Sequence, residues 1–138
     1  MEATFDAVRT DDPAASNRSR SRWIGRVLSA LPVLLLLFSA AAKFMKSAEV
    51  IEGMQRLGYP EHTILPLGIT ELLCTVLYVI PQTSVLGAIL LTAYLGGATV
   101  THLRVGEPFF PPILFCVIVW LGIFLRYPRL RALLPLRS

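Results

Sequence analysis

The residue with the clearest chemical meaning in this sequence is Glu71, a carboxyl group inside an otherwise uncharged apolar stretch. Placing a charged side chain in the middle of a lipid bilayer costs on the order of 2 to 3.5 kcal/mol, whereas each leucine gains only about 0.3 to 0.6 kcal/mol. We therefore expect Glu71 to face the interior of the protein. At 1.5 Å per helical residue, it lies about 12 Å from the outer end of its helix.

Other polar side chains fall where they can meet Glu71. Lys43 ends the first apolar block, and His102 and Arg104 end the third, so antiparallel helices bring them into the same half of the protein. The ligand-pocket candidates are Glu71, His102, Lys43, Tyr94, Arg104 and Tyr78, the tyrosines each lying two helical turns from His102 or Glu71. The alternative is that Glu71 joins two helices, by pairing with Lys43 or a hydroxyl.

Several kinds of chemistry leave no motif in this sequence. The only histidines, His62 and His102, have no cysteine or carboxylate partners at ligand spacing, so no metal site is expected. No Ser-His-Asp or Cys-His arrangement is legible, and Cys74 and Cys116 lie far apart in apolar blocks, as packing residues do. We therefore assign no catalytic residue and no identifiable cofactor.

The composition indicates one all-α integral membrane domain. The 138 residues are 54% hydrophobic and only 16% charged, with a mean hydropathy of +0.63. Four apolar blocks predict a four-helix transmembrane bundle, with spans at residues 23–42, 63–80, 84–103 and 109–125. The predicted division is a disordered cytoplasmic tail at 1–22, the transmembrane domain at 23–134 and a C-terminal tail at 135–138. Pro32 is expected to kink the first span.

A short amphipathic helix is predicted between the first two spans. Val50, Ile51, Met54 and Leu57 share one helical face, while Glu49, Glu52, Gln55 and Arg56 lie opposite. Ser47 is positioned to cap its start, and Gly58 and Pro60 to end it. We expect this helix to lie at the membrane interface. The alternative is a solvated connector.

The distribution of lysine and arginine predicts the orientation. Eight lysines and arginines lie before or near the start of the first span, or after the end of the fourth, and four lie on the opposite side. This excess favours cytoplasmic termini in a bacterial inner membrane. This pattern does not form the basic stripe of a nucleic-acid-binding surface, so no nucleic acid partner is expected. In the third span, Ala93 and Gly97 form a small-xxx-small pair, which predicts close helix packing within the subunit, with a dimer face as the alternative.

The sequence resembles the DoxX-like family of small bacterial membrane proteins over residues 24–134. The residues that carry this resemblance are the run from Phe44 through Gly-Tyr-Pro at 58–60, Gly-Ile-Thr-Glu-Leu at 68–72, Leu-Thr-Ala-Tyr-Leu-Gly-Gly-Ala at 91–98 and Thr-His-Leu-Arg at 101–104. The resemblance implies a four-helix transmembrane bundle, with Glu71 and His102 at characteristic positions. Namesake relatives are linked to thiosulfate:quinone oxidoreductase or membrane redox complexes, and more distant ones include sterol-binding proteins and a receptor-assembly chaperone.

These observations lead to one functional hypothesis and two alternatives. The hypothesis is that the protein binds a lipid, quinone or isoprenoid-like ligand in an intramembrane pocket containing Glu71. The first alternative is an accessory subunit or assembly factor, packed against a membrane-protein partner or a second copy of itself. The second is a quinone-linked oxidoreductase subunit, which would need a bound quinone or partner subunits because the chain has no redox motif.

Overall fold

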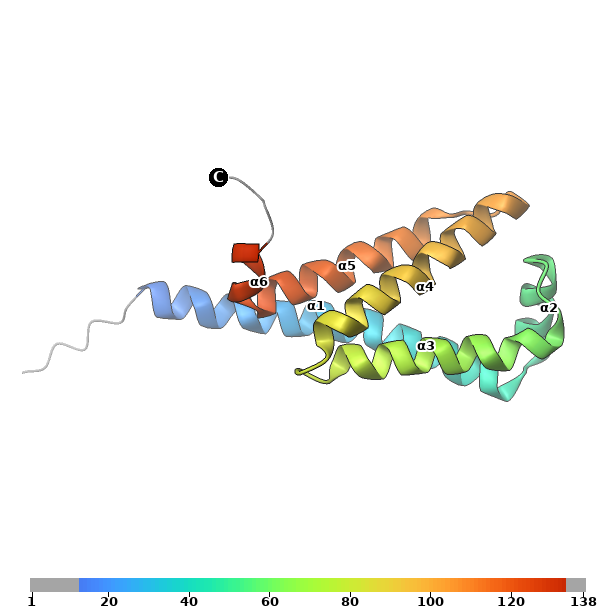
Figure 1. The fold of residues 1–138 in the computed structure, drawn as a ribbon, viewed down its shortest axis with the longest axis horizontal. Helices are drawn as coiled ribbons and strands as arrows, with labels where there is room; N and C mark the ends of the chain where they lie inside the picture. Colours follow the sequence, from blue (N-terminus) through green and yellow to red (C-terminus); the bar gives the residue numbers. More distant parts are fainter. Residues whose placement is uncertain (1–12, 134–138) are drawn as a thin grey trace, which may run out of the picture.

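All regular secondary structure in the part of the chain that the structure describes is helical. The structure is a computed structural model, which describes residues 13–133 and, within them, the side chains of residues 19–130. The elements along the chain are α1 (Pro13–Met45), α2 (Ala48–Arg56), the single 3-10 turn η1 (Glu61–Thr63), α3 (Ile64–Val79), α4 (Ser84–Val105), α5 (Phe110–Arg126) and α6 (Pro128–Leu133). Figure 1 shows their arrangement.

The long helices pack side by side. Both α1 and α4 contact α3 and α5, so each of these helices has two neighbours in the packed group. The start of α1 and helix α6 lie at one end of the molecule, and α2 lies at the other (Figure 1). The long helices α1, α3, α4 and α5 alternate in direction along the molecule (Figure 1).

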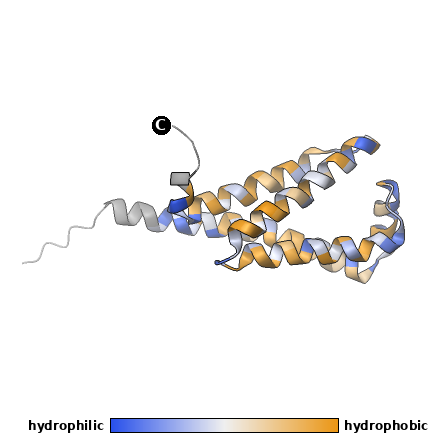
Figure 2. Ribbon diagram, viewed as in Figure 1, coloured by the Kyte–Doolittle hydropathy of each residue, from blue (hydrophilic) through white to orange (hydrophobic). Residues whose placement is uncertain are grey.

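The apolar helices are long enough to cross a bilayer. Among the described residues, three segments qualify by length and composition: Ser19–Met45, Glu61–Val79 and Ser84–Val105. Helix α5 is equally apolar but has 17 residues. Figure 2 shows hydrophobic residues along the middle of these helices and hydrophilic residues gathered at the ends of the molecule. This distribution is that of a membrane protein, as the composition predicted.

The observed helix bounds agree closely with the apolar blocks, except at the N-terminus. Helices α3, α4 and α5 begin and end within two residues of the predicted spans. Helix α1, however, begins at Pro13 instead of residue 23, so residues 13–22 are helical where a disordered tail was predicted. Proline is favoured at the first helical position, and a polar stretch without helix breakers extends a helix already formed by its neighbour. Residues 1–12 and the predicted tail at 135–138 lie outside the described residues.

The predicted amphipathic helix is confirmed as α2. The backbone N–H of Val50 donates to Ser47 Oγ at 3.4 Å, and Gly58 adopts the left-handed conformation, with a φ of 83°, just after the helix. The apolar side chains of the predicted face are half-buried, whereas Glu49, Glu52, Gln55 and Arg56 are exposed. Helix α2 therefore has one face toward the rest of the protein and one toward its surroundings.

Glycines allow the helices to approach closely near the end that carries α6. A Cβ atom at Gly87 of α4 would overlap the backbone of Tyr78 and Leu77 on α3. A Cβ at Gly25 of α1 would lie only 2.9 Å from the Cβ of Leu125 on α5. These contacts surround a core that contains Leu36, Cys74, Tyr78, Ala88, Leu91, Leu95, Val119 and Ile123.

The predicted packing role of Ala93 and Gly97 is not what the structure shows. A Cβ at Gly97 or at Gly96 would meet no described atom within 4 Å. Both glycines and Ala93 are exposed. The small residues of α4 thus have two different roles: Gly87 permits a close helix contact, whereas the Ala93–Gly97 pair leaves space.

This difference predicts opposite effects of the same substitution on one helix. Gly87→Ala should lower the free energy of unfolding by roughly 1 to 3 kcal/mol, because the added methyl group overlaps the α3 backbone. Gly96→Ala should leave stability unchanged or raise it by up to about 1 kcal/mol, since alanine is the better helix former. The measurement is the midpoint of SDS-induced unfolding of the purified proteins. Equal losses in both variants would contradict the close approach of α3 and α4.

Candidate functional site

The centre of the candidate site is an ion pair between the first two long helices. Lys43 Nζ on α1 lies 2.8 Å from Glu71 Oε2 on α3 and 2.7 Å from Ser39 Oγ, one turn earlier on α1. Ser39 Oγ in turn donates to Glu71 Oε2 at 3.3 Å. Glu71 is 2% exposed. The carboxylate therefore has both a charged and a neutral donor, which compensates for its removal from water.

The local sequence positions both members of the pair. Lys43 lies in the last turn of α1, where the helix dipole favours a positive charge. Gly68 lies three residues before Glu71, and a Cβ there would be only 3.1 Å from the Cβ of Lys43. The missing side chain at Gly68 lets the lysine stem cross α3 and reach the carboxylate one turn further along.

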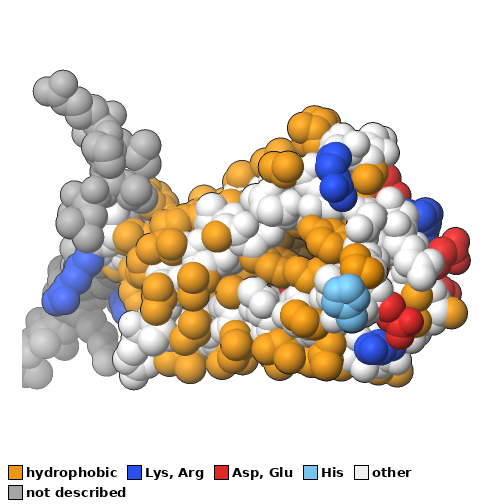
Figure 3. Space-filling view, turned by 45° about the vertical axis from the view of Figure 1, so that its right-hand side comes forward, with side chains coloured by type: hydrophobic (Ala, Val, Ile, Leu, Met, Phe, Trp, Pro, Cys, Tyr) orange, Lys and Arg blue, Asp and Glu red, His pale blue; other side chains and the backbone are white. Residues whose placement is uncertain are grey.

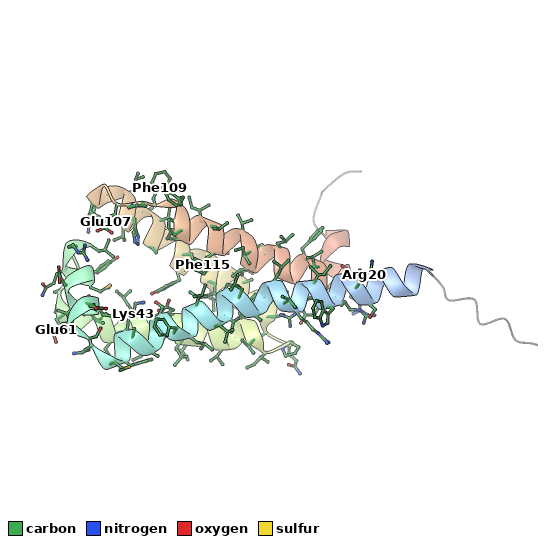
Figure 4. All side chains as sticks on the ribbon, turned by 180° about the vertical axis from the view of Figure 1, so that it is seen from behind. Arg20, Lys43, Glu61, Glu107, Phe109 and Phe115 are labelled. Atoms are coloured by element: carbon green, nitrogen blue, oxygen red, sulfur yellow. The ribbon has the colours of Figure 1, made fainter. Side chains whose placement is uncertain are left out.

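A cavity of about 430 Å³ opens beside the ion pair. Its polar wall includes Ser39, Lys43, Glu71, Tyr94 and His102. The remaining lining is mostly apolar, and consists of Met54, Leu57, Tyr59, Leu67, Ala93, Leu95, Gly97, Ala98, Thr101, Pro111, Pro112 and Phe115. In Figure 3 a hollow is visible between hydrophobic side chains and close to a histidine. Figure 4 shows Lys43 and Phe115 on facing sides of the space between the helices.

The segment from α2 to η1 forms the end wall of this cavity. The hydroxyls of Tyr59 and Thr101 lie 2.9 Å apart, and Arg104 Nη2 donates to the carbonyl of Leu57 at 2.9 Å. Both contacts join this segment to the last turns of α4. A second hollow of about 310 Å³ lies on the α2 side and shares Ser39, Lys43, Met54 and Leu57 with the first. Lys43 therefore borders both spaces.

His102 lines the cavity, and the contact of one ring nitrogen with its own helix indicates the tautomer of the imidazole. Its Nδ1 lies 2.7 Å from the carbonyl oxygen of Ala98, which can only accept a hydrogen bond. Nδ1 therefore carries a hydrogen, and in the neutral imidazole Nε2 is left as an acceptor.

The structure separates the six predicted pocket residues into three groups. Glu71, Lys43, Tyr94 and His102 line the cavity together. Arg104 lies at its end, where it holds the Leu57 carbonyl instead of lining the main space. Tyr78 was misplaced by sequence: it is fully buried, and its hydroxyl lies 3.0 Å from both Ser29 Oγ and the Val119 carbonyl. Because Tyr78 lies two helical turns beyond Glu71 on α3, it belongs to the core near the opposite end of the molecule.

Sequence reasoning missed some of the polar groups and most of the apolar lining. Ser39 had a usable signal, because it lies four residues before Lys43 and so shares its helical face. Tyr59 and Thr101 had none, since their contact joins residues 42 positions apart. The described residues contain no group of three or more potential metal ligands, and Cys74 and Cys116 are both free cysteines.

The fold and the apolar helices define a helical membrane protein, and comparison with known families identifies its kind. The sequence model of the DoxX-like family matches residues 27–122, which is more than half of the chain. The chain therefore belongs to the DoxX-like family, as the resemblance indicated. The matched region includes Lys43, Glu71 and His102. Searches of curated proteins and of solved structures found no match.

The ion pair predicts a non-additive response to substitution. Lys43→Met should lower the free energy of unfolding by roughly 1 to 3 kcal/mol, because it leaves a buried carboxyl group without its charged partner. The double variant Lys43→Met/Glu71→Gln should recover part of this loss, since no unpaired charge remains. SDS-unfolding midpoints of the wild type, Lys43→Met, Glu71→Gln and the double variant measure the coupling energy between the two side chains. The matched control is Thr70→Val, on the exposed side of α3; strictly additive losses would rule out a stabilising pair.

Proposed function

We propose that this protein is a bacterial inner-membrane protein of four transmembrane helices that binds a small apolar or amphipathic ligand. The ligand is a lipid, quinone or isoprenoid-like molecule, and its site is the cavity that contains Glu71. The observation that carries the proposal is the cavity itself, in which a buried ion pair and a histidine meet a mostly apolar wall.

The fourth span in this proposal is α5. Its 17 residues correspond to about 26 Å, close to the roughly 30 Å of a bilayer core and at the short end of known transmembrane helices. Arg126 stands at its end, where a long side chain can reach the headgroups. The start of α1 and helix α6 lie at one end of the molecule, which supports cytoplasmic placement of both termini under the positive-inside rule.

The dimensions and chemistry of the cavity support a ligand-binding role. A volume of about 430 Å³ lies within the range of roughly 300 to 1,000 Å³ typical of small-molecule sites. Such sites combine an apolar lining with a few polar groups that fix orientation. Here Tyr94 and Phe115 offer aromatic surface, while Lys43, Glu71 and His102 are the orienting groups. An accessory-subunit role requires no such cavity, so the ligand-binding function is the better supported of the two.

The proposed topology predicts which loops are reached from each side of the membrane. After Cys74 and Cys116 are replaced by alanine, a cysteine in place of Gln82 should react only with a reagent that enters the cytoplasm. A cysteine in place of Glu107 should react with an impermeant maleimide added to spheroplasts. Labelling of both positions from the same side would contradict four spans.

The proposed site predicts that a side chain added to one glycine, but not to its neighbour, expels the ligand. Gly97 lines the cavity, whereas the adjacent Gly96 does not, and both are exposed. Gly97→Phe should reduce the co-purifying small molecule by about tenfold or more, while Gly96→Phe should retain it. Mass spectrometry of extracts from gently purified protein makes the measurement. Absence of any retained molecule in the wild type, in Glu71→Gln and in Glu71→Ala would refute ligand binding, and a stoichiometric protein partner would favour the accessory-subunit role.

A further inference from the structure

We infer that the ligand is an electrically neutral amphiphile with a hydroxyl group, which enters the cavity sideways from the hydrocarbon core of the membrane. This inference rests on the proposed function and narrows it to a class of molecule. Three features of the cavity carry it: the balanced charge of its polar wall, the hydrogen-bonding groups exposed there, and the position of its opening.

The first feature is charge balance. Lys43 and Glu71 are in direct contact, and they are the two oppositely charged side chains that line the cavity. His102 lines the same cavity from α4. An unpaired carboxylate or ammonium brought into this low-dielectric site would lose its hydration without gaining an uncommitted counter-charge. A neutral head group avoids this loss.

The second feature is the set of hydrogen-bonding atoms that the pair leaves for a ligand. The hydrogen bonds from Ser39 and Lys43 both end on Oε2 of Glu71, and the Tyr94 hydroxyl also interacts with this carboxylate. A carboxylate oxygen has two lone pairs, so Oε1 retains capacity to accept a hydrogen bond from a ligand. The Lys43 ammonium has three hydrogens, of which two are directed to Ser39 and Glu71. A hydroxyl both donates and accepts, so one group can bind Oε1 and Lys43 at once. An ester or ketone carbonyl can only accept, and therefore matches half of the site.

The third feature is where the cavity opens. Ala93 and Gly97 line it and are also exposed. Gly97 lies eight residues before the end of α4 at Val105, or about 12 Å along the helix, which is at hydrocarbon depth in the proposed topology. Figure 3 shows the hollow on the side of the molecule, bordered by hydrophobic side chains. Meanwhile Met54 and Leu57 of the α2 segment form the wall at the end. An apolar tail can therefore remain in the bilayer while the head group reaches Glu71.

Three probes with the same C18 chain test the charge preference: oleyl alcohol, oleate and oleylamine. Each is added separately to the full-length protein in detergent micelles at about pH 8, where the carboxylate and the amine are both ionised. Retained probe is measured by mass spectrometry after size-exclusion chromatography, with Gly97→Phe as the background. The wild type should retain about ten times more oleyl alcohol than either charged probe, equivalent to about 1.4 kcal/mol.

Single substitutions in the pair should reverse the preference in opposite directions. Glu71→Gln leaves Lys43 without its partner, so oleate should become the preferred probe. Lys43→Met leaves the Glu71 carboxylate unpaired, so oleylamine should be preferred instead. Thr70→Val, one residue from Glu71 but on the exposed side of α3, should keep the wild-type order.

The possible outcomes separate this inference from the proposed function. Preference of the wild type for oleate or oleylamine would overturn the neutral-ligand inference and leave a ligand-binding site in place. If the wild type binds none of the three probes above background, the inference is overturned. If, in addition, no small molecule co-purifies with the wild type, Glu71→Gln or Glu71→Ala, the proposed function is overturned as well. The wild-type comparison is decisive by itself if either charge variant fails to fold.

Discussion

The contact between Lys43 and Glu71 is the interaction on which the arrangement of this protein depends. A carboxylate inside an apolar bundle is tolerated when a partner balances its charge and further donors satisfy its oxygens. Lys43 and Ser39, one turn apart on α1, meet both needs for Glu71 on α3. The pair thereby fixes how α1 and α3 are rotated against each other. It also makes one wall of the cavity polar and neutral overall.

The molecule is closely packed at one end and hollow at the other, and the difference follows from where its glycines lie. Gly25, Gly87 and Gly122 stand at helix contacts, where any Cβ would collide with a neighbouring helix. Close approach lets dispersion forces hold the helices together where the surrounding lipid offers no hydrophobic driving force. Beyond Leu91, Ala93 and Gly97 of α4 line the cavity, and a Cβ at Gly97 would meet no described atom within 4 Å. Tight packing at one end thus supports an open site at the other.

The segment that closes the hollow end is held by few contacts. Two of these contacts come from α4, because Tyr59 bonds with Thr101 and Arg104 bonds with the backbone of Leu57. A third is an exposed ion pair, in which Lys46 Nζ lies 3.6 Å from Glu61 Oε1. None of the residues of α2, all of which the structure describes, is fully buried. The stability of this short helix therefore comes from its N-cap and its amphipathic face, not from deep burial. The polar residues at the end of α4 therefore influence the shape of the site, although not all of them line it.

The sequence by itself determined the helices and the need to shelter Glu71, because both follow from transfer free energies that are local to each stretch of residues. It also determined the ends of α2, since Ser47 and Gly58 act within one turn of the helix. What only the tertiary structure decided is which side chains face one another. Helices that are apolar on nearly every side do not reveal their rotation, so Tyr94 lines the cavity and Tyr78 does not, although both looked equivalent in sequence. The same limit applied to Gly87 and Gly97, because a glycine permits contact only where a neighbouring helix is present to make it.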